Sequence, residues 1–186
     1  MAFLHAQFFN PALKAVAPVR KTLGVRTFFN ILGPLVNPSI PHRQLLGVYS
    51  LKLGRLYNYL YQQTDTRYTI VNSLDGYDEI SLTDDFKLFS NDGEEIVSPE
   101  ALGFERCHDG DLYGGETVAE AAAIFDRVLD NTASEAQKNA VIANAAYAIR
   151  TFDTKRPIET CVALARETVE SGRARATFRK FIELNS

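Results

Sequence analysis

The sequence predicts an α/β fold in which a central mixed, partly parallel sheet is flanked by helices. Two apolar runs of strand length, at 44–50 and 67–74, enclose a helical pattern at 53–63, and two further short strands surround the turn Asn91-Asp92-Gly93. Strand, helix and strand at this separation form a βαβ unit with a parallel pair and a right-handed crossover. Helical patterns occupy both ends of the chain, so the sheet is expected in the middle.

The composition fits a single soluble domain over 1–186. The chain has 186 residues, of which 46% are hydrophobic and 23% charged, and that apolar fraction can build a core. No apolar run reaches the ~20 residues that span a bilayer, and no signal-peptide pattern begins the chain, so we expect a cytoplasmic protein without a membrane partner. Two distant cysteines and three isolated histidines predict neither a disulfide scaffold nor a histidine metal site.

The first third of the chain predicts helices and an ordered loop. The segment 11–23 has helical spacing and begins with Pro11, which suits a first helical turn, while Pro18 should kink or restart the helix. The apolar segment 27–38 contains the turn signals Gly33-Pro34 and Asn37-Pro38. It therefore predicts a short helical piece that enters a loop.

The sheet and the C-terminal helices follow. The segment 67–74 is rich in β-branched and aromatic residues and stops at Asp75-Gly76, and 81–97 predicts two short strands followed by a helical turn at 98–100. Two capping boxes then predict helices to about 130 and about 151. A last helix is expected from Pro157, with a pause at Ser171-Gly172. The residues that define these helices are Thr117 and Glu120 in the first box, Ser134 and Gln137 in the second, Gly114-Gly115 as the entry turn, and Ala121, Ile124, Phe125 and Val128 as the inward face of the first helix.

The charges are distributed unevenly along the chain. Residues 1–64 contain seven Lys and Arg and no Asp or Glu, a formal charge of +7, whereas the remainder has 13 cations and 23 anions, or −10. This asymmetry indicates an anionic ligand near the first part, such as a phosphate, a carboxylate or nucleic acid. A basic segment that packs against an acidic one would give the same pattern, and composition does not separate the two.

Arg20 is the first candidate binding residue. On a helix it falls on the same stripe as Leu13, Val16 and Leu23. An unpaired arginine on an apolar face would be costly to bury, so it should meet an anion, and a carboxylate matches a guanidinium best. From geometry alone, a structural ion pair, or a stem that carries the charge to water, is the more common reason for such a position.

Two loops are further candidates. Gly33-Pro34 lies in an apolar segment, where a glycine lets a flat substrate approach the main chain, although a plain turn would look the same. Asp78 and Glu79 follow a predicted strand at its carboxyl end, where open α/β sheets place ligands. In a loop, both carboxylates can offer oxygens to hydrated Mg²⁺, although acidic pairs are commonly solvated surface. We interpret Asp84-Asp85 and Glu94-Glu95 as such surface.

Taken together, the sequence resembles the second half of the anthranilate phosphoribosyltransferase family, in the family's order and over essentially the whole chain. The resemblance rests on five segments: NPALKAVAPVRKTLGVRTFFNILGPLVNP (10–38), DGYDEIS (75–81), LYGGE (112–116), NAVIANAAYAI (139–149) and LARETVESGRA (164–174). It implies the large α/β domain of the nucleoside phosphorylase and phosphoribosyltransferase fold. It also implies transfer of a phosphoribosyl group from phosphoribosyl pyrophosphate to anthranilate, with Mg²⁺, in tryptophan biosynthesis.

The resemblance also implies roles for particular residues. Arg20 would bind the anthranilate carboxylate, Gly33 and Pro34 would line the aromatic pocket, and Asp78 and Glu79 would bind Mg²⁺ on the pyrophosphate. No protein nucleophile is expected. Asn10 departs from the family, which usually has a histidine before the Pro-Ala pair.

The family's glycine-rich phosphoribosyl pyrophosphate loop and its small helical domain, with the usual homodimer interface, would precede residue 1. We therefore expect the C-terminal domain of a longer enzyme, inactive by itself. Three alternatives stay open: a pyrimidine nucleoside phosphorylase-like domain, a non-enzymatic relative that binds single-stranded nucleic acid through the basic segment with Tyr57, Tyr59 and Tyr61, and an inert fragment that self-associates. The overall acidity argues against nucleic acid.

Overall fold

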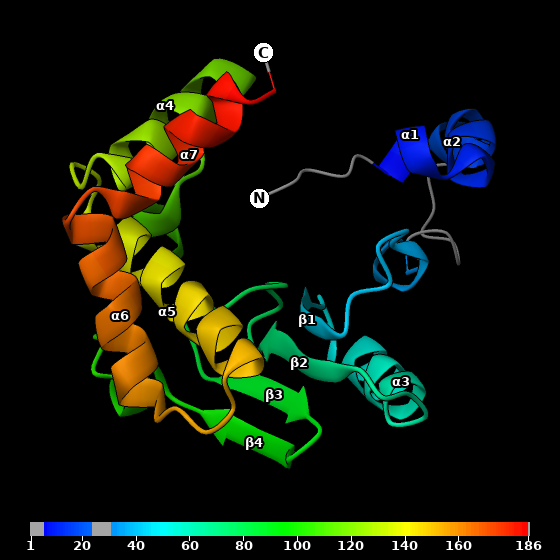
Figure 1. Cartoon of the computed structure of the whole chain (residues 1–186), viewed down its shortest axis with the longest axis horizontal. Helices are drawn as coiled ribbons and strands as arrows, with labels where there is room; N and C mark the ends of the chain where they lie inside the picture. The colour runs from blue at the N-terminus through cyan, green and yellow to red at the C-terminus, as the bar shows by residue number, and fades with distance from the viewer. Residues whose placement is uncertain (1–5, 24–30, 186) are drawn as a thin grey trace. The chain divides into compact units, whose positions relative to one another are not determined.

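A computed structural model describes residues 6–23 and 31–185 of the chain (Figure 1). The contacts of the chain divide it into two compact units, residues 1–42 and 43–186. The prediction of one domain over 1–186 stays a prediction. Within the described ranges, none of the helices combines the length and the apolar character that crossing a membrane requires.

The described part of the first unit consists of short helical elements. These are α1 (Ala6–Phe9), α2 (Pro11–Leu23) and the 3₁₀ helix η2 (Gly33–Val36). Contrary to the expected restart, α2 continues through Pro18 as one helix, and the Thr22 hydroxyl donates a hydrogen bond to the Pro18 carbonyl at 3.1 Å. The predicted helical piece at 27–38 lies partly outside the described residues, and its described end is η2.

The second unit contains a four-stranded mixed sheet in the order β1-β2-β3-β4. β1 and β2 are parallel and are joined through the helix α3, whereas β2 with β3 and β3 with β4 are antiparallel. The βαβ unit and the hairpin are therefore confirmed. The strands are β1 (Arg43–Gly47), β2 (Arg67–Ser73), β3 (Phe86–Ser90) and β4 (Gly93–Val97), and α3 spans Leu51–Tyr61.

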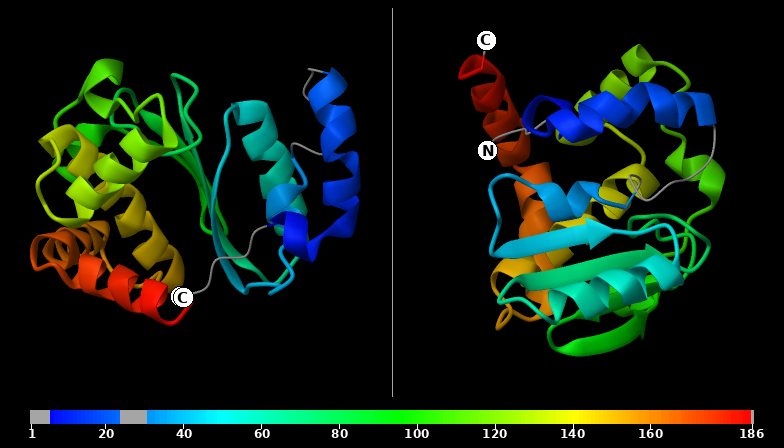
Figure 2. Two further views of the ribbon diagram at one scale, coloured as in Figure 1. Left: turned by 90° about the horizontal axis from the view of Figure 1, so that it is seen from above. Right: turned by 90° about the vertical axis from the view of Figure 1, so that its right-hand side faces the viewer.

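Helices cover both faces of the sheet. α3 packs on one face of β2 and β3, and α5 (Glu135–Phe152) packs on the other face of β1 and β2 (Figure 2, left). Tyr68 and Ile70 of β2 are buried on the α3 side, whereas Thr69 and Val71 are buried on the α5 side. Because both faces are covered, β2 is buried along nearly its whole length, which a central strand requires.

The C-terminal half is helical, as predicted. Gly115, at φ +87°, turns the chain into α4, and Gly172, at φ +74°, separates the last two helices. The elements are the 3₁₀ helices η3 (Pro99–Leu102) and η4 (Asp109–Leu112), then α4 (Val118–Leu129), α5, α6 (Ile158–Glu170) and α7 (Arg173–Glu183). Alanine and tyrosine side chains of α5 join β2 and β3 in the main core together with α6.

Two details of these helices were predicted incorrectly. In α4, Val128 is buried and Ile124 half-buried, but Ala121 and Phe125 are exposed. The Phe125 ring packs edge-on against Phe178 of α7 at 4.9 Å between centroids, so its partner is another helix and not the sheet. The box before α5 is only half formed: Ser134 accepts from the Gln137 amide at 3.3 Å, while the Gln137 side chain donates to the Tyr113 carbonyl at 3.1 Å.

The acidic pairs that we interpreted as solvated surface are partly ion-paired. Asp84 and Asp85 both pair with Arg106, which also bonds Glu100 at 3.0 Å. Glu94 pairs with Lys87 of the neighbouring strand at 3.0 Å. Sequence alone could not show this, because the partners come from other segments of the chain.

The complete capping box before α4 leads to a first prediction. The Thr117 hydroxyl accepts from the Glu120 amide at 3.2 Å, and the Glu120 carboxylate accepts from the Thr117 amide. We expect Thr117→Ala to destabilise the chain by about 1 kcal/mol, because an amide at the start of α4 loses its acceptor. Urea unfolding measures this. Thr160→Ala, at an exposed position of α6, is the control and should leave the midpoint unchanged or slightly raised, and an equal loss in both variants would contradict the capping role.

Candidate functional site

The acidic pair Asp78 and Glu79 lies in the loop that follows β2, at the carboxyl end of the parallel strand pair. β2 ends at Ser73 and its parallel neighbour β1 ends at Gly47. Open α/β sheets bind ligands at this edge, because the carboxyl ends of parallel strands and their loops meet there. Both carboxylates are exposed, so they can meet a ligand from solvent.

Hydrogen bonds from buried groups hold the main chain of this loop. The Ser73 amide donates to the Tyr77 carbonyl at 3.0 Å, and the Ser73 hydroxyl donates to the Glu79 carbonyl at 2.7 Å. Asn144 of α5 pairs with the backbone of Ile80 on both sides: its side-chain oxygen accepts from the Ile80 amide at 3.0 Å, and its side-chain nitrogen donates to the Ile80 carbonyl at 2.9 Å. Hydrogen bonds therefore hold the main chain of the loop at Tyr77, Glu79 and Ile80, beside the two carboxylates.

Gly47 fixes the same loop by its lack of a side chain. A Cβ atom at this position would lie 1.6 Å from the carbonyl oxygen of Asp78 and 2.7 Å from its carbonyl carbon. The main chain of Asp78 thus passes directly over the end of β1, and only glycine leaves room for it there.

The charges of the pair make the loop suitable for a cation. Within the described ranges, neither Asp78 nor Glu79 forms an ion pair with a lysine or arginine. Although Glu79 keeps an exposed surface, the surrounding protein displaces water from its carboxylate, and this desolvation together with the neighbouring Asp78 charge raises the pKa of Glu79. A bound cation would relieve that repulsion.

The donor set fits magnesium better than a metal held by the protein alone. No group of three or more His, Cys, Asp or Glu side chains able to hold a metal occurs in the part of the chain that the structure describes. Mg²⁺ typically uses one or two carboxylates and takes its other ligands from water and substrate phosphates. The two carboxylates of Asp78 and Glu79 match that requirement.

The other predicted site residues belong to the first unit. Gly33 begins η2, and among the described residues other than its chain neighbours no atom lies within 4 Å of the place where its Cβ would be, so the described part of the chain leaves space beside its main chain. Pro34 follows as a half-buried residue of the same turn. Arg20 is part of α2, but its side chain lies outside the described structure. The prediction that Arg20 shares an apolar stripe of the helix therefore stays a prediction.

The residues that support the acidic loop were not among the predicted ones. Gly47, Ser73 and Asn144 carry no chemistry themselves, and Gly47 and Asn144 act on residues that are distant in sequence. Asn144 alone gave a signal, because it is a polar residue inside the alanine-rich stretch 140–148 of a helix that packs on the sheet. A polar side chain on such a face must find a hydrogen-bond partner.

Comparison with known proteins places these features in a family. Residues 1–175 match the model described as "Glycosyl transferase family, a/b domain". The anthranilate phosphoribosyltransferase of Bacteroides fragilis is 63% identical over 185 residues, 100% of this chain and 56% of that protein, and that of Bacteroides thetaiotaomicron is 61% identical over 186 residues, with the same shares. The chain thus spans about half the length of the curated relatives that it matches.

Solved structures confirm the α/β fold. The crystal structure of anthranilate phosphoribosyltransferase from Thermus thermophilus superimposes with a TM-score of 0.89 at 32% identity, over 98% of this chain and 55% of that one. The enzyme from Saccharomyces cerevisiae in complex with phosphoribosyl pyrophosphate and Mg gives a TM-score of 0.88 at 25% identity, over 97% of this chain and 52% of that one.

Proposed function

This chain belongs to the glycosyl transferase family whose a/b domain it matches, and from that premise we propose that it forms the C-terminal α/β part of an anthranilate phosphoribosyltransferase. The reaction is transfer of a phosphoribosyl group from phosphoribosyl pyrophosphate to the amine of anthranilate, a step of tryptophan biosynthesis. The observation that carries the proposal is the exposed, unpaired carboxylate pair held rigidly at the carboxyl end of β2.

Asp78 and Glu79 would hold Mg²⁺ against the pyrophosphate of the donor substrate. When bound there, the ion would neutralise negative charge that develops on the leaving pyrophosphate. The role of the chain is to keep both carboxylates in place, since Ser73 and Asn144 hold the main chain at Glu79 and at the next residue, Ile80. The Mg-containing yeast neighbour supports this assignment.

Arg20 would bind the carboxylate of anthranilate by two parallel hydrogen bonds, and Gly33 and Pro34 would line the pocket for its ring. The open space beside Gly33 supports a flat ligand at that turn. The aromatic amine of anthranilate is neutral at pH 7, so the reaction needs positioning more than a base, and we assign no nucleophile. Asn10 would present an amide where the family usually has a histidine.

The proposed partners follow from the same assignment. They are the two substrates and the part of the enzyme that corresponds to the rest of the relatives' length, with a homodimer as the expected assembly and the cytoplasm as the expected location. This chain alone is expected to be inactive. A chimera tests the function: the chain replaces the matching segment of the Bacteroides fragilis relative, and loss of anthranilate fluorescence is followed with phosphoribosyl pyrophosphate and Mg²⁺. A folded chimera without phosphoribosylanthranilate formation would refute the proposal.

A second prediction concerns Arg20 in that chimera. We expect Arg20→Ala to raise the KM for anthranilate by about 10-fold to 100-fold, because a charge-assisted pair of hydrogen bonds to the carboxylate is lost. The KM for phosphoribosyl pyrophosphate should change little. Lys14→Ala, at an exposed position of the same helix, is the matched control. A fall in kcat with unchanged anthranilate KM would remove Arg20 from substrate binding.

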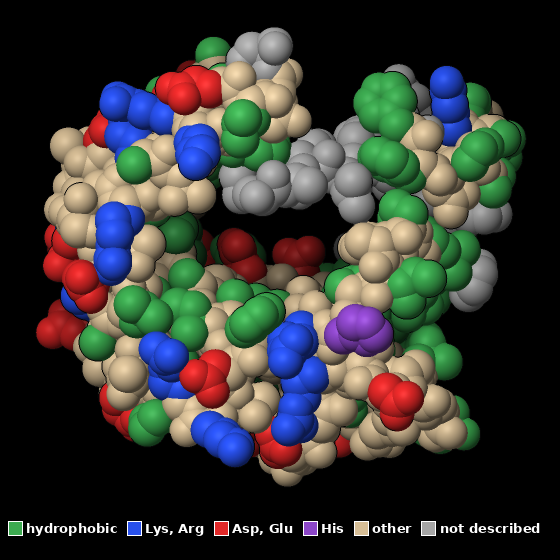
Figure 3. Space-filling view, viewed as in Figure 1, with side chains coloured by type: hydrophobic (Ala, Val, Ile, Leu, Met, Phe, Trp, Pro, Cys, Tyr) green, Lys and Arg blue, Asp and Glu red, His purple; other side chains and the backbone are tan. Residues whose placement is uncertain are grey.

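The nucleic-acid alternative loses support from the second unit. Tyr57 and Tyr61 are buried beneath the sheet, and only Tyr59 is exposed, so the three tyrosines cannot form a stacking surface. Over the helices α5 to α7, cationic and anionic side chains lie intermixed in place of one basic patch (Figure 3). Salt-dependent retention on single-stranded DNA would reopen this alternative. Phosphorolysis of thymidine by the chimera would favour the nucleoside phosphorylase alternative.

A further inference from the structure

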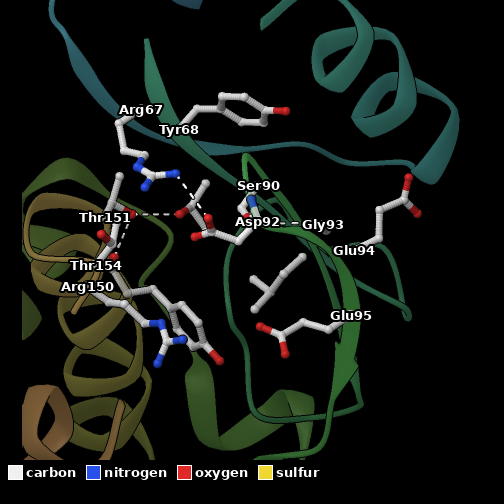
Figure 4. A pocket seen from close by; sticks show the side chains of 13 residues that line it. Arg67, Tyr68, Ser90, Asp92, Gly93, Glu94, Glu95, Arg150, Thr151 and Thr154 are labelled. Atoms are coloured by element: carbon white, nitrogen blue, oxygen red, sulfur yellow. Dashed lines mark hydrogen bonds and ion pairs between the residues drawn. The ribbon is translucent and has the colours of Figure 1, made fainter. Parts of the chain in front are cut away.

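A cavity of about 190 Å³ lies between the start of β2, the β3–β4 hairpin and the last turns of α5 (Figure 4). A second, more open cavity of about 580 Å³ shares Glu95, Tyr147 and Arg150 with it. All of these residues belong to the second unit. The first cavity adjoins the Arg67 end of β2, whereas the acidic loop follows Ser73 at the other end of that strand. Neither Asp78 nor Glu79 lines either cavity, so the proposed magnesium site does not explain them.

Two of the charges on the first cavity are left without a partner. Arg67 pairs with Asp92 at 3.2 Å, and Glu94 pairs with Lys87 at 3.0 Å. Arg150 and Glu95, in contrast, form no ion pair with any residue that the structure describes. Figure 4 shows their side chains reaching toward the same space from α5 and β4. The cavity therefore offers one cation and one anion to a ligand.

A buried tyrosine, Tyr147, lines both cavities together with these two charged residues. Tyr147 is only 4% exposed, and its hydroxyl has no hydrogen-bond partner among the described residues. Burial, and then the charge of Glu95, raise the pKa of Tyr147, so the hydroxyl keeps its proton and can donate it in a hydrogen bond. The hydroxyl is not among the fully buried unpaired groups of the described residues, so it keeps contact with solvent, and an acceptor bound in the cavity can take its hydrogen bond in place of water.

The second cavity adds an apolar wall to this polar end. Its lining includes Ile96, Val97, Leu102 and Ile158. Ile96 is 59% exposed although it stands beside the cavity, and a ligand that covered it would gain from burial of apolar surface. The site thus combines a guanidinium, a carboxylate and a hydroxyl donor with an adjoining apolar surface.

We propose that the two neighbouring cavities bind an apolar α-amino acid as its zwitterion. Arg150 binds the carboxylate, Glu95 binds the ammonium group, and the Tyr147 hydroxyl donates to a carboxylate oxygen. The apolar side chain of the ligand lies against the wall formed by Ile96, Leu102 and Ile158. The two charged groups of the ligand then meet charges that the protein leaves without an ion-pair partner.

A phosphate dianion fits the same cavity less well. Asp92, Glu94 and Glu95 surround it with three carboxylates against the two guanidinium groups of Arg67 and Arg150, so the lining as a whole repels a doubly charged anion. A zwitterion brings its own cation to Glu95 and avoids that repulsion.

Titration calorimetry on the full chain tests the proposal with L-leucine and L-phenylalanine as probes. At least one of them should bind saturably at one site. L-leucinamide, which lacks the carboxylate, and N-acetyl-L-leucine, which lacks the ammonium group, should each bind about 10-fold or more weakly. Absence of binding by both amino acids would overturn the proposal, and so would equal binding of the two derivatives or binding of inorganic phosphate in place of the amino acids.

Variants locate the binding in these cavities. Arg150→Gln should weaken the amino acid about 10-fold or more and remove the preference over the amide, and Glu95→Gln should remove the preference over the N-acetyl derivative. Tyr147→Phe should weaken binding about 5-fold. Arg127→Gln, at an exposed position of α4, is the control. Because Glu95 is exposed, Glu95→Gln should fold even where the other variants do not. If Glu95→Gln kept the preference for the amino acid over its N-acetyl derivative, the site would be refuted.

Discussion

Gly47→Ala is expected to displace the acidic loop and to weaken the response to magnesium by about 10-fold to 100-fold. A methyl group at Gly47 would overlap the carbonyl of Asp78, and neither main chain can yield without moving the loop. The bonds from Ser73 to Glu79 and from Asn144 to Ile80 would be strained or lost. Residues that position metal ligands typically contribute this much to metal affinity.

The same substitution should lower the free energy of unfolding by about 1–3 kcal/mol, as overpacking does elsewhere. The measurements are urea unfolding of the chain and the Mg²⁺ concentration for half-maximal activity of the chimera. Gly114→Ala is the matched control, because no atom of the described residues, apart from its chain neighbours, lies within 4 Å of a Cβ there. A normal magnesium requirement in a Gly47→Ala chimera would show that the position of this loop does not matter to the metal.

The double substitution Asp78→Asn and Glu79→Gln is expected to lower kcat/KM of the chimera by about 100-fold to 1000-fold, the loss typical of removing electrostatic stabilisation at a reacting centre. Both amides keep the shape of the carboxylates but lose their charge, so the added Mg²⁺ should no longer raise activity. The double variant Asp65→Asn and Glu105→Gln removes the same charge from exposed positions and should keep its magnesium response. An unchanged response in the first variant would remove both residues from the site.

The raised pKa of Glu79 allows the loss of activity in this double variant to be distinguished from unfolding. Because the pKa of Glu79 is higher in the folded chain than in the unfolded chain, the unfolded chain ionises first as the pH increases. At a pH above the raised pKa, the charged carboxylate therefore lowers the free energy of unfolding. Removing the charge should therefore leave stability at neutral pH unchanged or slightly higher, unlike Gly47→Ala. In the unsubstituted chimera, magnesium binding should weaken as the pH falls through the raised pKa, because protons compete for Glu79.

Much of the fold could be predicted because its signals are local. The alternation and composition of 67–74, the turn at Asn91-Asp92-Gly93 and the Thr117–Glu120 box each specify an element from adjacent residues, and the structure has all three. The helix α2 does not restart at Pro18, one of the two effects expected there, since a missing amide does not end a helix when the remaining turns continue on both sides. The direction of Phe125 also could not be predicted, because its partner Phe178 lies in another helix.

The sequence pointed to the candidate residues of the site but not to those that support them. Adjacent carboxylates after a strand are conspicuous, so the amino-acid pattern was enough to select Asp78 and Glu79 as candidates, while their role as metal ligands stays a prediction. Gly47 and Asn144 could not be selected in this way, because a glycine at a strand end and an asparagine in a helix acquire their meaning from what they touch across the fold. The assignments of Arg20, Gly33 and Pro34 likewise stay predictions.

The clamp of Asn144 on Ile80 links two regions that lie 64 positions apart along the chain. The amide hydrogen of Ile80 can exchange with solvent only when the loop leaves α5 or when α5 itself opens. Solvent exchange at this one backbone position therefore reports the integrity of the contact between loop and helix. Any ligand that holds the acidic loop against α5 would slow that exchange, even though it touches neither Ile80 nor Asn144.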